Sequence, residues 1–218
     1  MRRAVALLAA VLGLSSVGFA GACSSGTLAN YTAAGFSCTI GNLTFSNFSY
    51  TGTSFGGATA IPASGVAVLP ITGTEPGLEF TAGWVASSGE GLDSLIKYTV
   101  TITGGAINDL LLTMGGYGFT DAGDVAVAET SPQLSGGGLL VFDNSTGLAA
   151  SASVTGLSLT TLNLTKDITV AGHNTGTATL SDVTNQFSSG AVPEPASMLL
   201  LGSGLLGLAG YFRRRKKV

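Results

Sequence analysis

The sequence predicts an all-β fold, an antiparallel β-sandwich of about nine short strands, for residues 23–183. Three observations support this prediction. Val, Ile, Phe and Thr, which favour strands, recur throughout the region. Apolar and polar residues alternate with a period of two, and glycine pairs such as Gly104-Gly105 and Gly115-Gly116 interrupt the alternation. Apolar residues make up 45% of the chain, which is enough to bury a core and more than a disordered chain contains.

The alternation is most regular at residues 96–103, where Ile96 and Tyr98 would face the core while Lys97 and Thr99 face solvent. Residues 78–84 repeat the pattern. The remaining strands are expected at 39–50, 66–71, 106–114, 124–129, 139–144, 152–164 and 175–183. No segment between 23 and 183 has the longer apolar period of a helix, so almost no helix is expected there. Residues 184–192 read as a linker.

Charge is distributed unevenly along the chain. Seven of the nine basic residues lie at the two ends, so the middle keeps only Lys97 and Lys166 against eleven acids, a net charge of −9. Such a surface repels phosphate backbones, and we therefore expect no nucleic-acid partner.

The N-terminus has the three parts of a secretory signal peptide, predicted as a helix over residues 1–22. Arg2 and Arg3 are basic, residues 4–14 are apolar, and Ala20-Gly21-Ala22 supplies small residues for cleavage after Ala22. A retained N-terminal anchor is the alternative interpretation, which the short apolar run disfavours.

Cleavage after Ala22 would place Cys23 at the new N-terminus. This resembles a lipoprotein box, although Ala20 stands where such boxes prefer Leu. The other interpretation is a disulfide between Cys23 and Cys38, the two cysteines of the chain, in an oxidising compartment. A bridge across a loop of this length would stabilise the fold by about 3 kcal/mol. We favour the disulfide.

The C-terminal residues 193–218 form three consecutive parts. Pro193-Glu194-Pro195 is expected to be extended, because each proline disfavours helix in the residue before it. Residues 198–212 carry no charge, and as a helix they would rise about 22 Å, short of the roughly 30 Å hydrocarbon core. A basic cluster that would stay on the cytoplasmic side follows: Arg213, Arg214, Arg215, Lys216 and Lys217. The pattern predicts a short, marginal transmembrane helix.

This order of proline motif, short glycine- and leucine-rich span and terminal basic cluster resembles the PEP-CTERM sorting signal of Gram-negative bacteria that make exopolysaccharide. The resemblance covers the tail alone. It implies that an exosortase-type membrane protease recognises Pro193-Glu194-Pro195 and removes the tail after a transient stay in the inner membrane. It also implies delivery to the cell surface or extracellular matrix, with exopolysaccharide as a candidate partner.

The middle of the chain contains few residues typical of catalysis. Its single histidine, His173, lies in an Ala-Gly-His-Asn-Thr-Gly turn, and no G-x-S-x-G motif supports a serine triad. One His and two Cys are too few for a zinc site, and no cofactor is expected. Calcium bound by Asp121, Asp124 and Asp109 is a minor alternative to a solvated loop.

Three hypotheses follow, one of which is an anchored periplasmic protein whose tail is never removed. We favour a non-enzymatic surface or matrix protein, with a carbohydrate-binding sandwich as its specific version. Trp84, Tyr98 and Tyr117 are the aromatics to test for sugar stacking, although Trp84 is expected in the core. The alternative is a polysaccharide hydrolase that uses paired carboxylates, with these candidates: Glu75, Glu79, Glu90 and Asp93.

Overall fold

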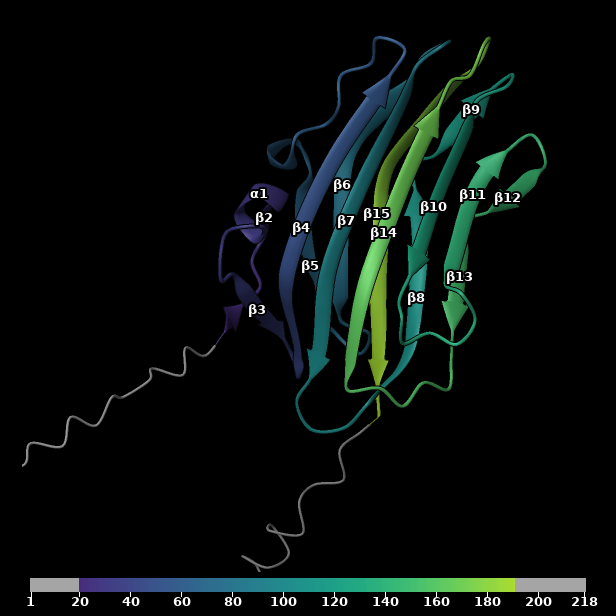
Figure 1. Ribbon diagram of the computed structural model, residues 1–218. Coiled ribbons are helices and arrows are strands. Elements are labelled where there is room, and N and C mark those ends of the chain that lie inside the picture. The colour runs from purple at the N-terminus through teal and green to yellow at the C-terminus, as the bar shows by residue number, and fades with distance from the viewer. Residues whose placement is uncertain (1–19, 191–218) are drawn as a thin grey trace, which may run out of the picture.

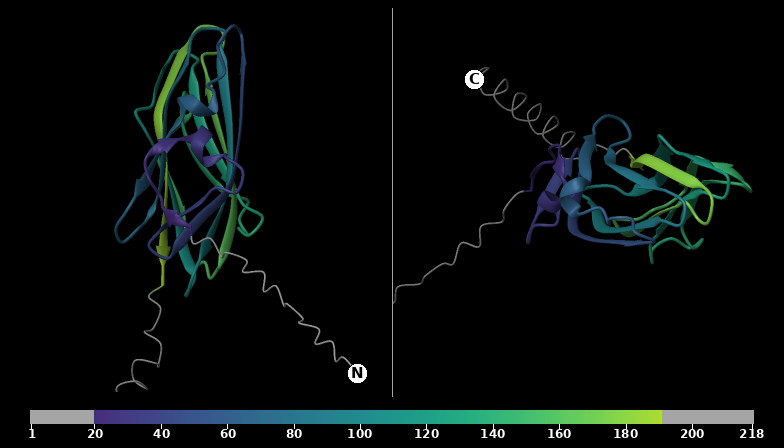
Figure 2. Two further views of the ribbon diagram at one scale, coloured as in Figure 1. Left: turned by 90° about the vertical axis from the view of Figure 1, so that its left-hand side faces the viewer. Right: turned by 90° about the horizontal axis from the view of Figure 1, so that it is seen from above.

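The computed structural model describes residues 20–190, which form two β-sheets packed face to face (Figure 1). The two layers are seen edge-on in the left view of Figure 2. Apart from one parallel pair at an edge, neighbouring strands are antiparallel, so the predicted all-β antiparallel sandwich is confirmed. Helix in this part of the chain is limited to α1 (Leu28–Tyr31) and a single 3-10 turn at Ala63–Gly65.

The eight-stranded sheet lies in front in Figure 1. In spatial order its strands are β1 (Gly21–Ala22), β3 (Ser37–Ile40), β4 (Leu43–Phe55), β7 (Gly91–Ile102), β14 (Thr161–Ala171), β10 (Asp124–Thr130), β11 (Leu139–Asn144) and β12 (Gly147–Ala149). The centre of this sheet is formed by β4, β7 and β14, which are paired over almost their whole lengths.

The second sheet has seven strands. Its spatial order is β13 (Ser151–Val154), β8 (Ile107–Gly115), β15 (Thr177–Ser189), β6 (Gly77–Ala86), β5 (Ala67–Ile71) and β2 (Gly26–Thr27). The remaining strand, β9 (Gly118–Thr120), pairs with the first residues of β15.

Every second residue along the strands faces inward, and these side chains fill the space between the sheets as the core. Aromatic rings are central to it: Phe48 stacks on Tyr98 with 5.4 Å between ring centroids, and Phe45 contacts Tyr98 and Phe187. Trp84 is fully buried and donates a hydrogen bond from Nε1 to Ser94 Oγ at 3.0 Å. The expected core position of Trp84 is therefore confirmed.

Several predicted strand boundaries were wrong. Residues 20–190 form fifteen strands rather than nine, because two predicted strands each divide into two and four further strands (β1, β2, β9 and β12) contain only two or three residues and show no alternation. The strand predicted at 39–50 is a hairpin of β3 and β4 that turns at Gly41-Asn42, where Gly41 has a φ of 60°. The strand predicted at 152–164 is two strands, β13 and β14, that belong to different sheets.

The predicted linker 184–192 also needs correction, because β15 continues to Ser189 and its residues 184–189 pair with β8. The sequence prediction ended both strands too early because each has a polar residue at an inward position, Lys166 in β14 and Asn185 in β15.

Most of the two predicted sorting segments lies outside the described residues. This applies to residues 1–19 of the expected signal peptide and to the tail 193–218 with its span 198–212. Gly21 and Ala22 form β1, so cleavage after Ala22 would remove that strand and leave Cys23 in place. Between residues 20 and 190, no helix has both the length and the apolar character needed to cross a membrane.

Candidate functional site

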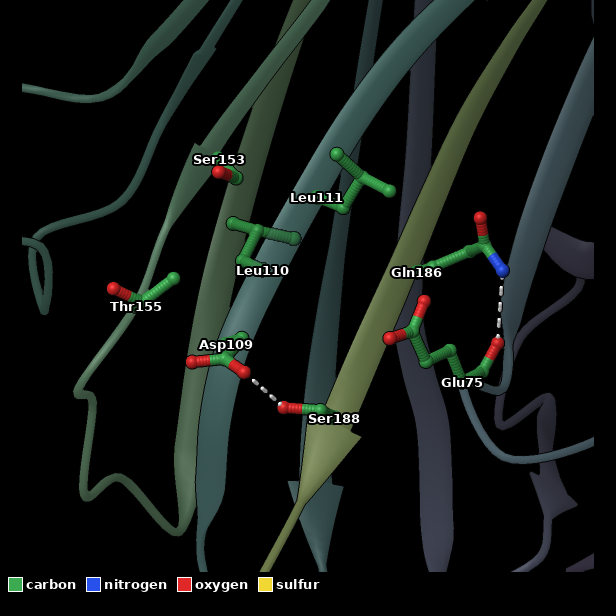
Figure 3. Close-up of a pocket in the computed structure, with 8 residues that line it drawn as sticks. All are labelled: Glu75, Asp109, Leu110, Leu111, Ser153, Thr155, Gln186 and Ser188. Atoms are coloured by element: carbon green, nitrogen blue, oxygen red, sulfur yellow. Dashed lines mark hydrogen bonds between the residues drawn. The ribbon is translucent and has the colours of Figure 1, made fainter.

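A shallow pocket of about 220 Å³ opens on the seven-stranded sheet (Figure 3). In this view Asp109 lies at β8, and the side chain of Glu75 reaches toward it so that its carboxyl group overlaps β15. Asp109 accepts hydrogen bonds from Ser188 Oγ at 2.6 Å and from the Gly156 amide at 3.3 Å, and Gln186 donates to the backbone oxygen of Glu75 at 3.1 Å. The residues that line the pocket include no aromatic side chain. The pocket therefore offers polar contacts but no stacking surface.

The four carboxylates predicted for catalysis lie in different surroundings. Glu75 lines the pocket, whereas Glu90 lies between β6 and β7 and accepts the Ser87 amide at 3.0 Å. Glu79, on β6, lies close enough to Asp182 to raise the pKa of that carboxyl, after the larger effect of burial. Of the four, only Glu75 lines the pocket, and Asp109 as its neighbour there was not foreseen.

Asp93 lies on the outer face of the eight-stranded sheet with Asp167 as a cross-strand neighbour. In the register of β7 and β14, Asp93 is opposite Thr169 and Asp167 is opposite Leu95, so the two acids are diagonal neighbours. Burial, and then the charge of Asp167, raise the pKa of Asp93. The buried Oδ1 of Asp167 accepts no hydrogen bond from the described residues. Sequence reasoning missed this pair because it depends on strand register.

The same outer face carries hydroxyl and amide side chains in a connected row. Thr99 Oγ1 accepts from Asn47 Nδ2 at 3.3 Å and donates to Asn163 Oδ1 at 2.9 Å, which links β4, β7 and β14. Near the end of β4, Thr53 lies opposite Asp93, and Phe55 follows two residues later on the same face. We call this outer surface of β4, β7 and β14 the polar face.

Phe55 is the exposed aromatic of the polar face. Its side chain is 56% exposed, and its ring lies over Gly91, where an added Cβ would meet ring carbon Cζ at 2.0 Å. The sequence prediction placed stacking aromatics elsewhere: Trp84 and Tyr98 are buried, and Tyr117 is half-buried. Trp84 and Tyr98 are thus excluded as sugar-stacking side chains, and Phe55 takes their place as a candidate.

His173 lies in the turn between β14 and β15 with a φ of 48°, and its Nε2 contacts Asp124 Oδ1. Within residues 20–190 no serine hydroxyl bonds to this ring, so the arrangement is a surface pair and not a triad.

The predicted calcium ligands are not brought together. Asp109 lies opposite Ser188, whereas Asp121 and Asp124 flank the start of β10 near the Thr177 end of β15. Eleven strand residues separate these ends, about 36 Å. No three His, Cys, Asp or Glu side chains of residues 20–190 are placed to hold a metal ion.

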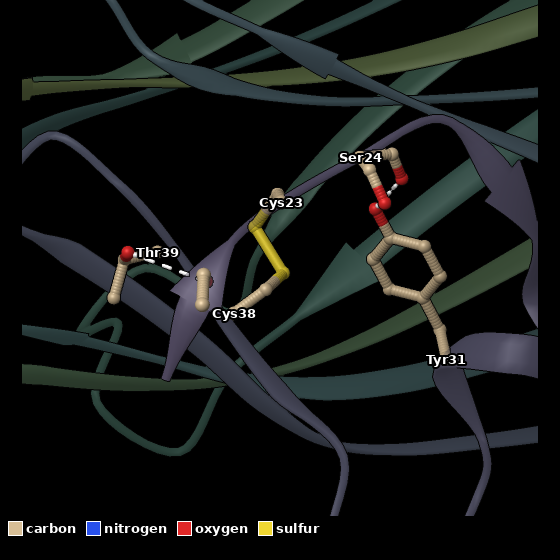
Figure 4. Close-up of a disulfide and its surroundings, with 6 residues drawn as sticks. Cys23, Ser24, Tyr31, Cys38 and Thr39 are labelled. Atoms are coloured by element: carbon tan, nitrogen blue, oxygen red, sulfur yellow. Dashed lines mark hydrogen bonds between the residues drawn. A yellow bond between two sulfur atoms is a disulfide. The ribbon is translucent and has the colours of Figure 1, made fainter. Parts of the chain in front are cut away.

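Cys23 and Cys38 form a disulfide at the N-terminal edge of the sandwich (Figure 4). Their Cα atoms are 4.8 Å apart, and the Cys23 amide donates to Thr39 O at 2.9 Å. Nearby, Tyr31 donates from its hydroxyl to Ser24 O at 2.8 Å. The predicted pairing is confirmed, and a sulfur in this bond is not free to carry a lipid.

A polar cluster that the sequence did not reveal lies in the core between the sheets. Glu129 (β10) accepts a hydrogen bond on Oε2 from Lys166 Nζ (β14) at 2.6 Å, and both side chains are 0% exposed. Asn185 (β15) donates from Nδ2 to Glu129 Oε1 at 2.7 Å and accepts on Oδ1 from the Tyr98 hydroxyl (β7) at 2.8 Å. The bonds to Asn185 cross from one sheet to the other. We call these four residues the core cluster.

Burial changes the acid–base properties of the core cluster. It lowers the pKa of Lys166, an effect that the charge and hydrogen bond of Glu129 oppose. Burial, and then the charge of Glu129, raise the pKa of Tyr98 well above its ordinary value, so this hydroxyl keeps its proton and remains a donor. A sequence signal did place Lys166 inside. Every second residue of β14 faces the core, and these residues are Leu162, Leu164, Lys166, Ile168 and Val170.

Replacing Asp93 with Asn should stabilise the protein at neutral pH. The raised pKa of Asp93 means that the folded state binds this proton more tightly than the unfolded chain, so wild-type stability increases as pH falls through that pKa. Urea unfolding of Asp93→Asn should therefore show a higher midpoint than wild type at pH 7, and the difference should shrink at acidic pH. Asp143→Asn, on β11 of the same sheet, is the control. A difference that is constant with pH would contradict this expectation.

In comparisons with known proteins, one family model matches the chain, and the match lies in the tail. Residues 191–216 match the family model described as the PEP-CTERM protein-sorting motif. A comparison with curated proteins found no match. The match includes the proline motif and the basic residues up to Lys216, and it leaves the sandwich unassigned.

Several solved structures resemble the chain at low identity. TmCBM61, solved with β-1,4-galactotriose, is 11% identical, with 63% of this chain and 86% of that chain covered and a TM-score of 0.31. The xylan-binding module CBM15 is 13% identical over 65% and 92%, with a TM-score of 0.28. A family 11 carbohydrate-binding module from Clostridium thermocellum is 8% identical over 64% and 88%, with a TM-score of 0.22.

The sandwich fold itself rests on the two hydrogen-bonded sheets of this chain. The assignment of the tail rests on the family match, which agrees with the resemblance seen in the sequence. Residues 191–216 of this chain are therefore a PEP-CTERM protein-sorting motif.

Proposed function

We propose that this chain is an exported protein that is processed at its C-terminus and delivered to the cell surface or extracellular matrix. The observation that carries the proposal is the sorting motif at residues 191–216. In this proposal the signal peptide directs export, and residues 198–212 hold the chain briefly in the inner membrane. An exosortase-type protease then recognises Pro193-Glu194-Pro195 and removes the tail. The Cys23–Cys38 disulfide is consistent with a compartment outside the cytoplasm.

For the sandwich we propose a non-enzymatic role in which the polar face associates with extracellular polysaccharide. The polar face combines one exposed aromatic ring, Phe55, with hydroxyl and amide groups such as Thr99 and Asn163. Sugars present apolar C–H faces and many hydroxyl groups, so a ring for stacking beside hydrogen-bonding side chains suits them. The acidic charge of the domain favours a neutral or cation-bridged polymer over an anionic one.

A second candidate is a hydrolase whose carboxylates are Glu75 and Asp109. The pocket that both residues line supports it, since glycosidases use two acids that flank the scissile bond. Against it, both carboxyl oxygens of Asp109 already accept hydrogen bonds within the chain, from Ser188 and from the Gly156 amide.

Replacement of Pro193, Glu194 and Pro195 with alanine should leave the tail attached, because the protease would lose the extended segment that it grips. In the native host, mass spectrometry of the C-terminus should place the wild-type end near Pro193 and the variant end at Val218. Pro132→Ala, a proline in an exposed loop of the sandwich, is the matched control and should be processed normally. A wild-type protein that ends at Val218 would refute processing.

Phe55→Ala should weaken binding to the exopolysaccharide of the producing cell at least about fivefold, because a stacked ring contributes on the order of 1 kcal/mol. Affinity electrophoresis through gels that contain the polymer measures this. Val85→Ala is the matched control: Val85 is 54% exposed but lies on the other sheet. Equal binding by both variants would exclude the polar face. Release of reducing ends that Asp109→Asn abolishes would favour the hydrolase instead.

A further inference from the structure

The core cluster places an amine and an amide on the same carboxylate in a region closed to water. Glu129 receives Lys166 Nζ on one oxygen at 2.6 Å and Asn185 Nδ2 on the other at 2.7 Å. The two oxygens share one carbon, so the lysine amine and the asparagine amide are hydrogen-bonded to the same carboxyl group. All three side chains are fully buried.

We propose that Lys166 and Asn185 are joined by a self-catalysed amide cross-link, in which the lysine amine displaces ammonia from the asparagine side chain. Glu129 moves the protons, and Tyr98 activates the carbonyl group. This would be a covalent modification of the folded chain that no bound cofactor or oxidant is needed to drive.

The nucleophile needs a free electron pair, and the site provides one. Burial disfavours the charged form of Lys166 and lowers the pKa of this lysine. Transfer of a proton from Lys166 Nζ to Glu129 Oε2 along their short contact replaces two buried charges by a neutral amine and a neutral acid. Lysines desolvated in apolar surroundings are activated in this way.

The electrophile is the side-chain carbonyl carbon of Asn185. The Tyr98 hydroxyl donates to Oδ1, which is the atom where negative charge develops when an amine attacks that carbon. Because the pKa of Tyr98 is raised, this donor stays protonated. The arrangement has the parts of an acyl-transfer site: a nucleophile, a proton carrier and an oxyanion donor.

The atoms balance without another reactant. The neutral amine of Lys166 bonds to Cγ of Asn185 and gives up one proton to Glu129, whose acid form protonates the departing Nδ2. The Cγ–Nδ2 bond breaks, and one molecule of ammonia leaves. This ammonia takes up the proton that Glu129 first received from Lys166 and leaves as ammonium, so Glu129 is again a carboxylate. The product is a Nζ–Cγ amide, and no oxidation or reduction occurs.

The cross-link would join the two sheets. Lys166 belongs to β14 in the eight-stranded sheet and Asn185 to β15 in the other, nineteen residues later in the chain. Cross-links that close loops restrict the unfolded chain, and this one would also resist forces that pull the sheets apart. Such resistance suits a protein that is exposed outside the cell.

Trypsin digestion of the unfolded, reduced full-length protein, with mass analysis, tests the proposal. Lys97 and Lys166 are the only tryptic sites between Arg3 and Arg213. A cross-linked Lys166 carries no charge and resists trypsin, so one peptide should begin at Tyr98, continue past Asn185 and be lighter by one ammonia. Cleavage after Lys166 with both peptides at full mass would overturn the proposal. Ammonia loss from a peptide still cleaved at Lys166 would overturn it too.

One variant tests the role of Glu129, and a second variant is its control. Glu129→Gln keeps the size of the side chain but cannot take the proton, so its Lys166 should be cleaved normally and its mass should be complete. Lys97→Gln, at the exposed lysine of β7, is the matched control and should still lose one ammonia. A cross-link in Glu129→Gln at the wild-type level would overturn the role of Glu129. If that variant does not fold, the wild-type digest alone decides.

Discussion

Glu129 and Lys166 face each other across neighbouring strands inside a sandwich whose described core contains only three other buried polar side chains. In the folded chain before the proposed amide forms, the two side chains are buried charges, which are costly unless they are paired. Asn185, from the other sheet, donates to the second oxygen of Glu129, and Tyr98 in turn donates to Asn185. Because these bonds are directional and connect the four side chains across both sheets, they fix how the sheets stack, whereas the surrounding apolar contacts are less directional.

The core cluster also explains where sequence reasoning succeeded and failed. The alternation at Leu78–Trp84 and at Ile96–Ile102 gave correct inward faces, because apolar residues fill those positions. Lys166 and Asn185 occupy inward positions too, but a polar residue there looks like the end of a strand. The sorting tail was readable because its signal is local, whereas the Asp93–Asp167 pair and the exposed ring of Phe55 depend on which strands become neighbours.

The sorting tail and the sandwich depend on different physical features of the chain. The tail combines a proline motif with a short apolar stretch of sequence, and the match at residues 191–216 covers both. In the sandwich, the Cys23–Cys38 bridge holds the N-terminal edge and the core cluster connects the two sheets. The polar face is left free of these structural roles and is the surface available for a partner.

A double-mutant cycle of Glu129→Leu and Lys166→Met tests most directly whether the core cluster holds the sheets together. Each single variant leaves one buried charge without its partner, which should lower the free energy of unfolding by about 3–5 kcal/mol. The double variant should lose much less than the sum of the two, because no buried charge remains in it. Urea unfolding of the four proteins measures this, and costs that are small and additive would contradict the account.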